Sequence, residues 1–414
     1  MITNILKMGA QVPQRFRTLG LSHVLDNPNA YGTAASDQFG YSIAASGDYV
    51  VVGVPFEYDV GGTSSGKVYV FNVNTGALLY TLHNPNAYGT SAGDQFGVSV
   101  DVCGDYLVAG AHLEDEVGNT SSGKVYVFNI HTGALLHVLN NPNAYGTPST
   151  DYFGFSVAAS DNYVVVGAYL EDDAGGASSG KAYIFSIHTG ALLHVLHNPN
   201  AYGTSSDDRF GLSVSAAGDY VVAGAHLEDN ISYTNVGAVY VFRASTGALL
   251  HTLHNPNAYG TPRDDYFGFS VAASDNYVVV GAYLEDDAGG TSSGKAYIFS
   301  IHTGALLHVL HNPNAYGTTR DDYFGFSVAA SGDYVVVGAY LEDEVSRSSS
   351  GKAYVFNAVT GVLLHTLNNP NTYGTAASDQ FGRAVAISDG HVVVGVPFED
   401  DVGGTSSGKV YIFS

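Results

Sequence analysis

The sequence predicts an all-β chain folded as a seven-bladed β-propeller, in which every blade is a four-stranded antiparallel sheet. The segment Asn-Pro-Asn recurs every 57 residues without insertions, at Asn27, Asn84, Asn141, Asn198, Asn255, Asn312 and Asn369. Each repeat holds four short segments with strand character, and none has helix signals. Four antiparallel strands per repeat are the content of one propeller blade.

The first repeat shows where these strands are expected. Residues 39–45 alternate large and small side chains, and residues 49–54 form an apolar run. The pair Gly47-Asp48 between them suits the positive φ of a type I′ hairpin. After a longer loop, residues 68–71 and 78–82 are the third and fourth strands, joined by a tight turn at Thr75-Gly76.

The two ends of the chain predict ring closure. The last repeat stops before its fourth strand, and Leu21 to Leu25 match the missing segment. We therefore expect these residues to pair with Val410 to Phe413 and to remove an open sheet edge. This gives an N-terminal arm at residues 1–17 and one propeller at residues 18–414. The alternative is an open solenoid of seven β-modules, which would need caps instead of complementary half-blades.

Composition restricts the function. The net charge of −23 disfavours nucleic acid as a partner, because such a field repels phosphate backbones. Cys103 is the single cysteine, so no intrachain disulfide is expected. Residues 1–17 lack the apolar core of a secretory signal, and no apolar run reaches bilayer length. A soluble chain without membrane insertion is expected, with a cell-surface, extracellular or virion location left open.

The repeat carries a recognisable motif. A Phe-Gly pair stands at Phe39, Phe96, Phe153, Phe210, Phe267, Phe324 and Phe381, and Gly53-Val54-Pro55 and Gly66-Lys67 follow it in the first copy. This pattern resembles the FG-GAP repeat, which forms the propeller of integrin α-subunits and of many bacterial and phage surface proteins. The resemblance implies the fold but not a function. The family's calcium loop between the first two strands is replaced here by a two-residue turn, as in the prokaryotic type, so that calcium site is not carried over.

Acidic residues gather in the long loops. Because strands alternate direction, both tight turns of a blade should lie on one face and both long loops on the other, which should be strongly negative. The expected hairpin register places Asp37 opposite Tyr58, beside Glu57 and Asp59. Carboxylates beside backbone carbonyls suit Ca²⁺. The candidate metal ligands are Asp37, Glu57, Asp59, Asp94, Glu114, Glu116, Asp151, Glu171, Asp173, Asp265, Glu285, Asp287, Asp322, Glu342, Asp379, Glu399 and Asp401. The alternative is that Asp37 caps backbone amides and that Glu57 belongs to a solvated rim.

One tyrosine follows each Asn-Pro-Asn segment and is a candidate ligand-binding residue: Tyr31, Tyr88, Tyr145, Tyr202, Tyr259, Tyr316 and Tyr373. These tyrosines either pack between blades or form seven equivalent pockets suited to a sugar, in which case weak sites would add up through avidity.

The sequence favours a binding protein over an enzyme. Histidines recur at one position of the fourth strand, for example His137, His194 and His251, so they cannot converge on one metal. The blades are nearly identical, whereas a catalytic centre needs an asymmetric constellation. We expect no cofactor apart from Ca²⁺. The expected function is a non-catalytic scaffold for protein or glycan surfaces, multivalent and assisted by cations, in a monomer or a larger assembly. The alternative is a structural module of an envelope or virion assembly.

Overall fold

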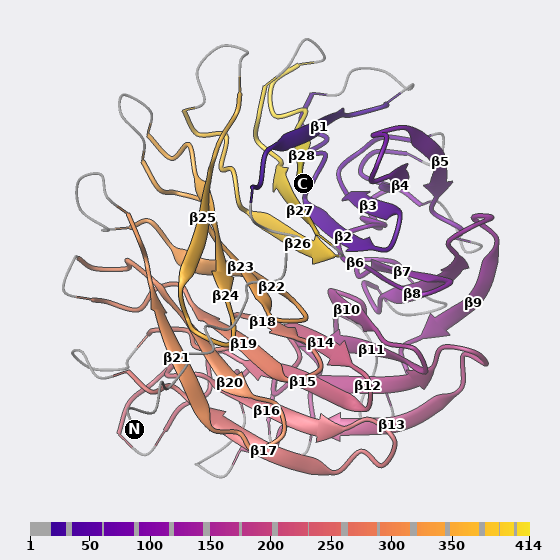
Figure 1. Ribbon diagram of the computed structural model, residues 1–414. Coiled ribbons are helices and arrows are strands. Elements are labelled where there is room, and N and C mark those ends of the chain that lie inside the picture. The colour runs from indigo at the N-terminus through magenta and orange to yellow at the C-terminus, as the bar shows by residue number, and fades with distance from the viewer. Residues whose placement is uncertain are drawn as a thin grey trace, which may run out of the picture.

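The computed structural model describes residues 18–29, 35–59, 62–86, 91–115, 120–143, 150–173, 176–200, 206–230, 232–257, 264–287, 290–314, 321–343, 348–371, 377–388, 390–400 and 404–414. These residues form seven four-stranded antiparallel sheets arranged around a common axis, as Figure 1 shows. The described residues contain no helix, and so none that could span a membrane. The predicted seven-bladed propeller is confirmed, and the proposed arm, residues 1–17, lies outside the described residues.

The strands follow the repeat, and each blade runs from an inner strand at the axis to an outer strand at the rim. Blade 1 contains β2 (Ser42–Ser46), β3 (Tyr49–Val54), β4 (Lys67–Asn72) and β5 (Leu78–His83). Blade 2 contains β6 (Val100–Cys103), β7 (Tyr106–Ala111), β8 (Lys124–Asn129) and β9 (Leu135–Asn140), and blade 3 contains β10 (Ser156–Ala159), β11 (Tyr163–Ala168), β12 (Lys181–Ser186) and β13 (Leu192–His197). Blade 4 contains β14 (Ser213–Ala217), β15 (Tyr220–Ala225), β16 (Ala238–Arg243) and β17 (Leu249–His254), and blade 5 contains β18 (Ser270–Ala273), β19 (Tyr277–Ala282), β20 (Lys295–Ser300) and β21 (Leu306–His311). Blade 6 contains β22 (Phe324–Ser331), β23 (Tyr334–Ala339), β24 (Lys352–Asn357) and β25 (Leu363–Asn368).

Blade 7 is completed by the first strand of the chain. It contains β26 (Ala384–Ser388), β27 (His391–Val396) and β28 (Lys409–Phe413), and β1 (Leu21–Asp26) pairs with β28 as the outer strand. Leu21 lies opposite Phe413 and Leu25 opposite Val410. The predicted closure is confirmed, and Gly20 and Ser414 extend it by two backbone hydrogen bonds of 3.1 and 3.0 Å.

The register of the inner hairpin is as expected, since Ser42 pairs with Gly53 and Ser46 with Tyr49. Two details differ from the prediction. In blade 1 the inner strand begins at Ser42 rather than Phe39, because the Phe39 N–H bonds the Ser407 carbonyl of blade 7 instead of its own hairpin partner. The turn is not of type I′: Gly47 has φ 55°, whereas Asp48 has no positive φ. Glycine fills only the first turn position, so only that residue takes the left-handed conformation.

The hydrophobic core lies between the blades. Each cluster combines side chains of two neighbouring sheets; for example, Val125 and Val127 of blade 2 pack with Val164, Val166 and Tyr183 of blade 3. The phenylalanine of each Phe-Gly pair is fully buried and contacts the ring of a β-strand tyrosine in its own blade, such as Phe153 on Tyr183. Stability therefore depends on contact between adjacent blades rather than on a core within each sheet.

Glycines allow neighbouring blades to approach main chain to main chain. A Cβ on Gly53 would collide with the carbonyl oxygen of Gly97, which belongs to the Phe-Gly pair of the next blade. That same carbonyl accepts a 2.8 Å hydrogen bond from Ser42 Oγ, and Gly97 itself has φ 86°. The glycines of the repeat motif are thus required at the blade boundary, both for space and for conformation.

Removal of β1 is expected to destabilise the ring. A truncation that starts at Asn27 exposes the edge of β28 and removes Leu25, which is 2% exposed and packs in one apolar cluster with Val410 and Ile412. Loss of that leucine's burial alone costs about 2 kcal/mol. Thermal unfolding should show a clearly lower melting temperature than a deletion of residues 1–17, which keeps β1. Equal melting temperatures for both deletions would refute the closure as a source of stability.

A side chain at a blade-boundary glycine should be poorly tolerated. In Gly281→Ala the new Cβ meets the Gly325 carbonyl oxygen and Ser270 Oγ, so backbone must move. We expect a loss of about 1–3 kcal/mol, measured by urea unfolding. Gly20→Ala is the matched control, because no heavy atom lies within 4 Å of its Cβ position. The packing account fails if both variants unfold at the same urea concentration.

Candidate functional site

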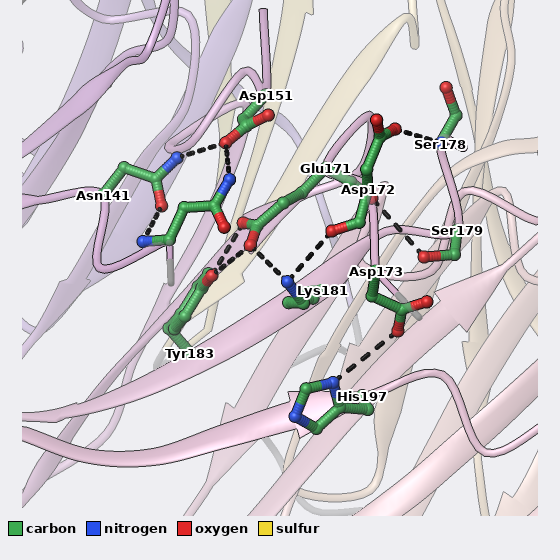
Figure 2. Close-up of polar contacts among 11 residues, drawn as sticks. Asn141, Asp151, Glu171, Asp172, Asp173, Ser178, Ser179, Lys181, Tyr183 and His197 are labelled. Atoms are coloured by element: carbon green, nitrogen blue, oxygen red, sulfur yellow. Dashed lines mark hydrogen bonds and ion pairs between the residues drawn. The ribbon is translucent and has the colours of Figure 1, made fainter. Parts of the chain in front are cut away.

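A buried polar cluster is repeated in every blade, and Figure 2 shows the copy in blade 3. Glu171 follows the end of β11 and is fully buried. Lys181 at the start of β12 donates a 2.6 Å hydrogen bond to its carboxylate, and Tyr183 donates to both carboxylate oxygens at 2.6 and 2.7 Å. The buried carboxylate therefore has a charged and a neutral donor from the adjacent strand.

The Asn-Pro-Asn segment holds a second buried carboxylate. Asn141 and Asn143 both donate to Asp151 Oδ2, at 2.9 and 2.6 Å, and the Asn143 backbone N–H bonds the Asn141 side chain. The same pattern occurs in all seven copies, for example between Asn27, Asn29 and Asp37. The two asparagines thus serve to bind the aspartate that precedes each Phe-Gly pair.

Burial dominates the electrostatics of this cluster. It raises the pKa of Glu171 to about 7, although the hydrogen bonds from Lys181 and Tyr183 act in the opposite direction. It also raises the pKa of Asp151 to about 6, against the two asparagine hydrogen bonds. Burial and the neighbouring Glu171 carboxylate raise the pKa of Tyr183 far above its ordinary value, so its hydroxyl stays a proton donor.

The expectation of a solvated glutamate rim is wrong. The aspartates before Phe-Gly and the glutamates after the second strand are buried in all seven copies, at no more than 4% exposure: Asp37, Glu57, Asp94, Glu114, Asp151, Glu171, Asp208, Glu228, Asp265, Glu285, Asp322, Glu342, Asp379 and Glu399. Many carboxyls assigned to a negative surface therefore lie inside the blades, next to lysine, tyrosine and asparagine donors. The exposed acids of the long loops are those of the next position, such as Asp172.

The candidate metal ligands do not share a centre in the described part of the chain. In blade 3, Asp151 bonds two asparagines, Glu171 bonds Lys181 and Tyr183, and Asp173 lies 3.6 Å from His197 Nδ1. No group of three or more histidine, cysteine or acidic side chains among the described residues has a metal-binding arrangement. Glu116 and Asp401 lie outside the described residues, as do the candidate ligand-binding residues Tyr31, Tyr88, Tyr145, Tyr202, Tyr259, Tyr316 and Tyr373. Cation binding stays a prediction.

Blade 4 lacks the lysine of this cluster. Ala238 stands where blade 3 has Lys181, and Tyr240 alone donates to Glu228, at 2.7 Å to each oxygen. Burial raises the pKa of Glu228 to about 8, and the nearby Asp208 carboxylate adds to this shift. Burial also raises the pKa of Asp208 to about 7. The tyrosine is therefore sufficient to place the glutamate, and the lysine of the other blades favours its charged form.

A second feature breaks the sevenfold repetition. At the long-loop end of the axis, three repeat positions carry different side chains in different blades: the residue after Asp37, the residue after Gly40 and the residue after Val54. At these positions, the aromatic rings, histidines and Arg383 that contact one another form, with Phe56 and Phe398, what we call the axial aromatic cluster. Its members are Tyr41, Phe56, His112, Tyr152, Phe155, Tyr169, His226, Tyr266, Phe269, Tyr283, Tyr323, Phe326, Tyr340, Arg383 and Phe398.

The rings of this cluster connect blade to blade. Tyr283 of blade 5 lies 5.3 Å from both Tyr323 and Phe326 of blade 6, measured between ring centroids. The Arg383 guanidinium of blade 7 lies 5.2 Å from the centre of the Phe326 ring and 5.8 Å from that of Tyr41 in blade 1. Arg383 thus joins blades 6, 7 and 1 through cation–π contacts.

Two histidines in the cluster are buried and neutral. His112 and His226 are 6% and 4% exposed, and their Nδ1 atoms have no hydrogen-bond partner among the described residues. Burial lowers the pKa of His112 to about 4 and, together with the Arg209 charge, that of His226 to about 3. This cluster was not predicted from the sequence, because the prediction used the positions that are the same in all repeats. The positions that differ between repeats would have indicated it.

The histidines of the outer strands have the structural role expected of them. His137 Nε2 lies 3.0 Å from the His188 carbonyl oxygen in the next blade, and His251 makes the same contact with His302. These contacts tie each outer strand to the neighbouring turn and do not converge.

A lysine restored in blade 4 should stabilise the protein mainly at alkaline pH. Because the pKa of Glu228 is raised in the folded protein, the contribution of this carboxyl group to the free energy of unfolding is complete below pH 4.5. That contribution is lost as the pH rises through about 8. Ala238→Lys supplies the missing charge, so we expect a gain of about 1–3 kcal/mol at pH 8.5 and a much smaller one at pH 5. Chemical unfolding at both pH values measures this.

The mirror variant Lys295→Ala reproduces the blade 4 arrangement in blade 5 and should lose stability at pH 8.5. A gain for Ala238→Lys that is the same at both pH values would contradict the electrostatic explanation.

The comparisons with known proteins agree with the repeat. The family model described as "FG-GAP repeat" matches residues 29–71, 86–128, 144–185, 200–242, 258–299, 315–356 and 373–413, which together make up more than half of the chain. No curated protein matches the sequence. With seven matched repeats and the blade geometry described above, the chain belongs to the FG-GAP repeat family.

Proposed function

We propose that this protein is a non-catalytic binding scaffold that holds a protein or glycan surface against its long-loop face. The observation that carries the proposal is the axial aromatic cluster. Blades 3, 5 and 6 carry the same tyrosine, phenylalanine and tyrosine at its three positions, whereas blades 1, 2, 4 and 7 carry other side chains there, and the framework around them hardly changes. Variation gathered at one end of the axis favours recognition of a partner there, because packing between blades does not require it.

The chemistry of the cluster suits a macromolecular surface. Tyr152, Tyr266 and Tyr323 are half-buried, so each ring is fixed by its neighbours and still offers a face and a hydroxyl. Fixed aromatic rings lose little conformational entropy on binding and dominate the energetics of interfaces. The same rings stack on the apolar faces of sugars, which is why we retain both partner classes.

The polar residues support a role without catalysis. Glu171, Lys181 and Tyr183 form one buried unit in which each group already has a partner, as Figure 2 shows. A general acid or base must instead reach a substrate. The unit recurs around the ring, so it belongs to the framework of the blade.

Two further elements complete the proposal. The seven tyrosines of the Asn-Pro-Asn loops would supply equivalent contacts around the axis, and equivalent weak contacts add up when they engage together. Ca²⁺ bound by the remaining loop carboxylates would assist them. We place such a protein at a cell surface, outside the cell or on a virion, where adhesion is the task.

A second candidate is a structural module of a larger assembly. The outer strands expose paired apolar side chains around the rim, including Leu78 and Leu79 at 43% and 45%, and Leu192 and Leu193 at 42% and 43%. The segments that carry them have no charged residue from Leu78 to His83 or from Leu192 to His197. An apolar, uncharged edge strand is a ready contact for another chain.

One pair of variants tests the first candidate against the second. The axial variant replaces Tyr152, Tyr266 and Tyr323 by glutamine, which blades 1, 2 and 7 carry at this position with the same positive φ. The rim variant replaces Leu192 and Leu306 by glutamine. Immobilised proteins are probed with a printed glycan array and with a surface-protein extract.

We expect the axial variant to bind the retained partner at least about tenfold more weakly, with an unchanged melting temperature, and the rim variant to bind like the natural protein. The opposite pattern, loss in the rim variant alone, would reject the first candidate in favour of the second.

A further inference from the structure

The seven inner strands enclose a cavity on the propeller axis. Its volume is about 380 Å³, and every blade contributes to its wall through β2, β6, β10, β14, β18, β22 and β26. Figure 1 shows these strands gathered at the centre of the ring. The lining extends to Ser46, Ser331 and Ser388, the last residues before their hairpin turns, so the cavity reaches toward the tight-turn face.

The wall of this cavity is polar in its backbone and apolar in its side chains. Each inner strand is the edge strand of its sheet, so part of its peptide groups point away from the sheet and toward the axis. The side chains between them are mostly valine and alanine, such as Val157, Ala158 and Ala272. Such a wall offers carbonyl acceptors together with surface for methylene groups.

One carboxylate breaks the symmetry of the wall. Asp101 is the only acidic, basic or histidine residue among the described lining residues. Five of the other six blades present alanine at this repeat position, three of them in the sequence Val-Ala-Ala, and blade 4 presents Ser215. Sequence comparison among the copies could have singled out Asp101, because no other inner strand carries a charge at this position.

The Asp101 carboxylate is held in place by backbone groups of the wall. Its oxygens accept hydrogen bonds from the N–H groups of Val102 at 2.8 Å and Ala159 at 2.7 Å. Ser215 makes the same contact with Ala273 at 2.9 Å in blade 4. An uncharged oxygen is therefore enough to bridge two inner strands, and the negative charge of Asp101 is additional to that bridge.

No basic side chain among the described residues of the wall compensates this charge. Burial raises the pKa of Asp101 to about 6, against its two backbone hydrogen bonds, so the carboxylate is ionised at pH 7.5. The neighbouring Cys103 thiol lies 3.5 Å from Asp161, and burial with that carboxylate raises the pKa of Cys103 to about 12, so it stays neutral. At the long-loop end of the axis, Arg383 is engaged by the rings of the aromatic cluster.

We infer that the axial cavity binds a small aliphatic amine, whose ammonium group pairs with Asp101 and whose methylene chain lies along the valine and alanine wall. An ammonium group has three donors, which match the carboxylate and the inward carbonyl groups. A divalent metal is a poorer match, since Ca²⁺ takes six to eight oxygen ligands and Asp101 supplies the only carboxylate among the described lining residues. A chain of several carbons also fits the cavity volume better than one ion.

Isothermal titration at low ionic strength with putrescine, a four-carbon diamine, tests this assignment. Asp101→Ser copies the residue of blade 4 and keeps the bridge to Ala159, so the variant should fold; it should bind putrescine at least about tenfold more weakly. Ser215→Ala, which removes the equivalent bridge without a charge, should bind like the natural protein. Ser215→Asp adds a second carboxylate and should bind more tightly.

Titrations with other ligands distinguish an ammonium site from a site for a neutral molecule or a metal ion. The neutral diol of the same length should not bind, and binding as strong as that of putrescine would overturn the proposal. Equal affinity of Asp101→Ser and the natural protein, or tighter Mg²⁺ binding that depends on Asp101, would also overturn it. Asp101-dependent binding of a lysine peptide would support the ammonium site and identify a protein tail as its source. The axial glutamine variant described above should keep putrescine binding, so the two proposals fail independently.

Discussion

The main-chain contact between adjacent blades is the constraint on which the rest of the structure depends. Gly53 and Gly97 meet at this boundary with no room for a Cβ, and the Ser42 hydroxyl and the Phe96 N–H form hydrogen bonds across it. Because each blade buries its side chains against the next one, these contacts fix the distance at which every apolar cluster packs. The Phe-Gly pair and the glycine at the end of the second strand thus recur for a geometric reason.

The buried polar unit is the second constraint, and it explains how so acidic a chain folds. Fourteen of its carboxyls are inside the blades, where asparagine, tyrosine and lysine donors replace water. A buried carboxyl with hydrogen bonds is tolerated, whereas one without them is not. Blade 4 shows which partner is dispensable: Glu228 keeps Tyr240 and does without a lysine. The unit is therefore a hydrogen-bonded support for the long loops first and an ion pair second.

Most of the fold could be predicted from the sequence, because the chain contains seven copies of the same pattern. The spans of the strands, the inner hairpin register and the pairing of β1 with β28 all follow from alternation and from the missing fourth strand. Burial in the loops could not be predicted in this way: Glu57 stands in no periodic segment, and only the position of Lys67 and Tyr69 on the next strand shows that it points inward. The predicted turn type was also wrong, because glycine fills only the first turn position and Asp48 does not take a positive φ. The axial aromatic cluster was not predicted, because positions with the same residue in every repeat were taken as the functional ones.

Symmetry itself decides where a single ligand can bind in such a protein. A residue away from the axis occurs in seven equivalent surroundings, so it produces seven equal sites unless one copy has changed. Near the axis the seven copies meet, and one substitution alters a surface that all blades share. Arg383, which precedes β26, and Asp101, which lies within β6, are substitutions of this kind. Neither position is held by the glycine contacts or by the buried polar unit, so both were free to change without loss of the ring. In a near-identical repeat, selectivity for one partner therefore belongs to the axis, and multivalent binding belongs to the loops around it.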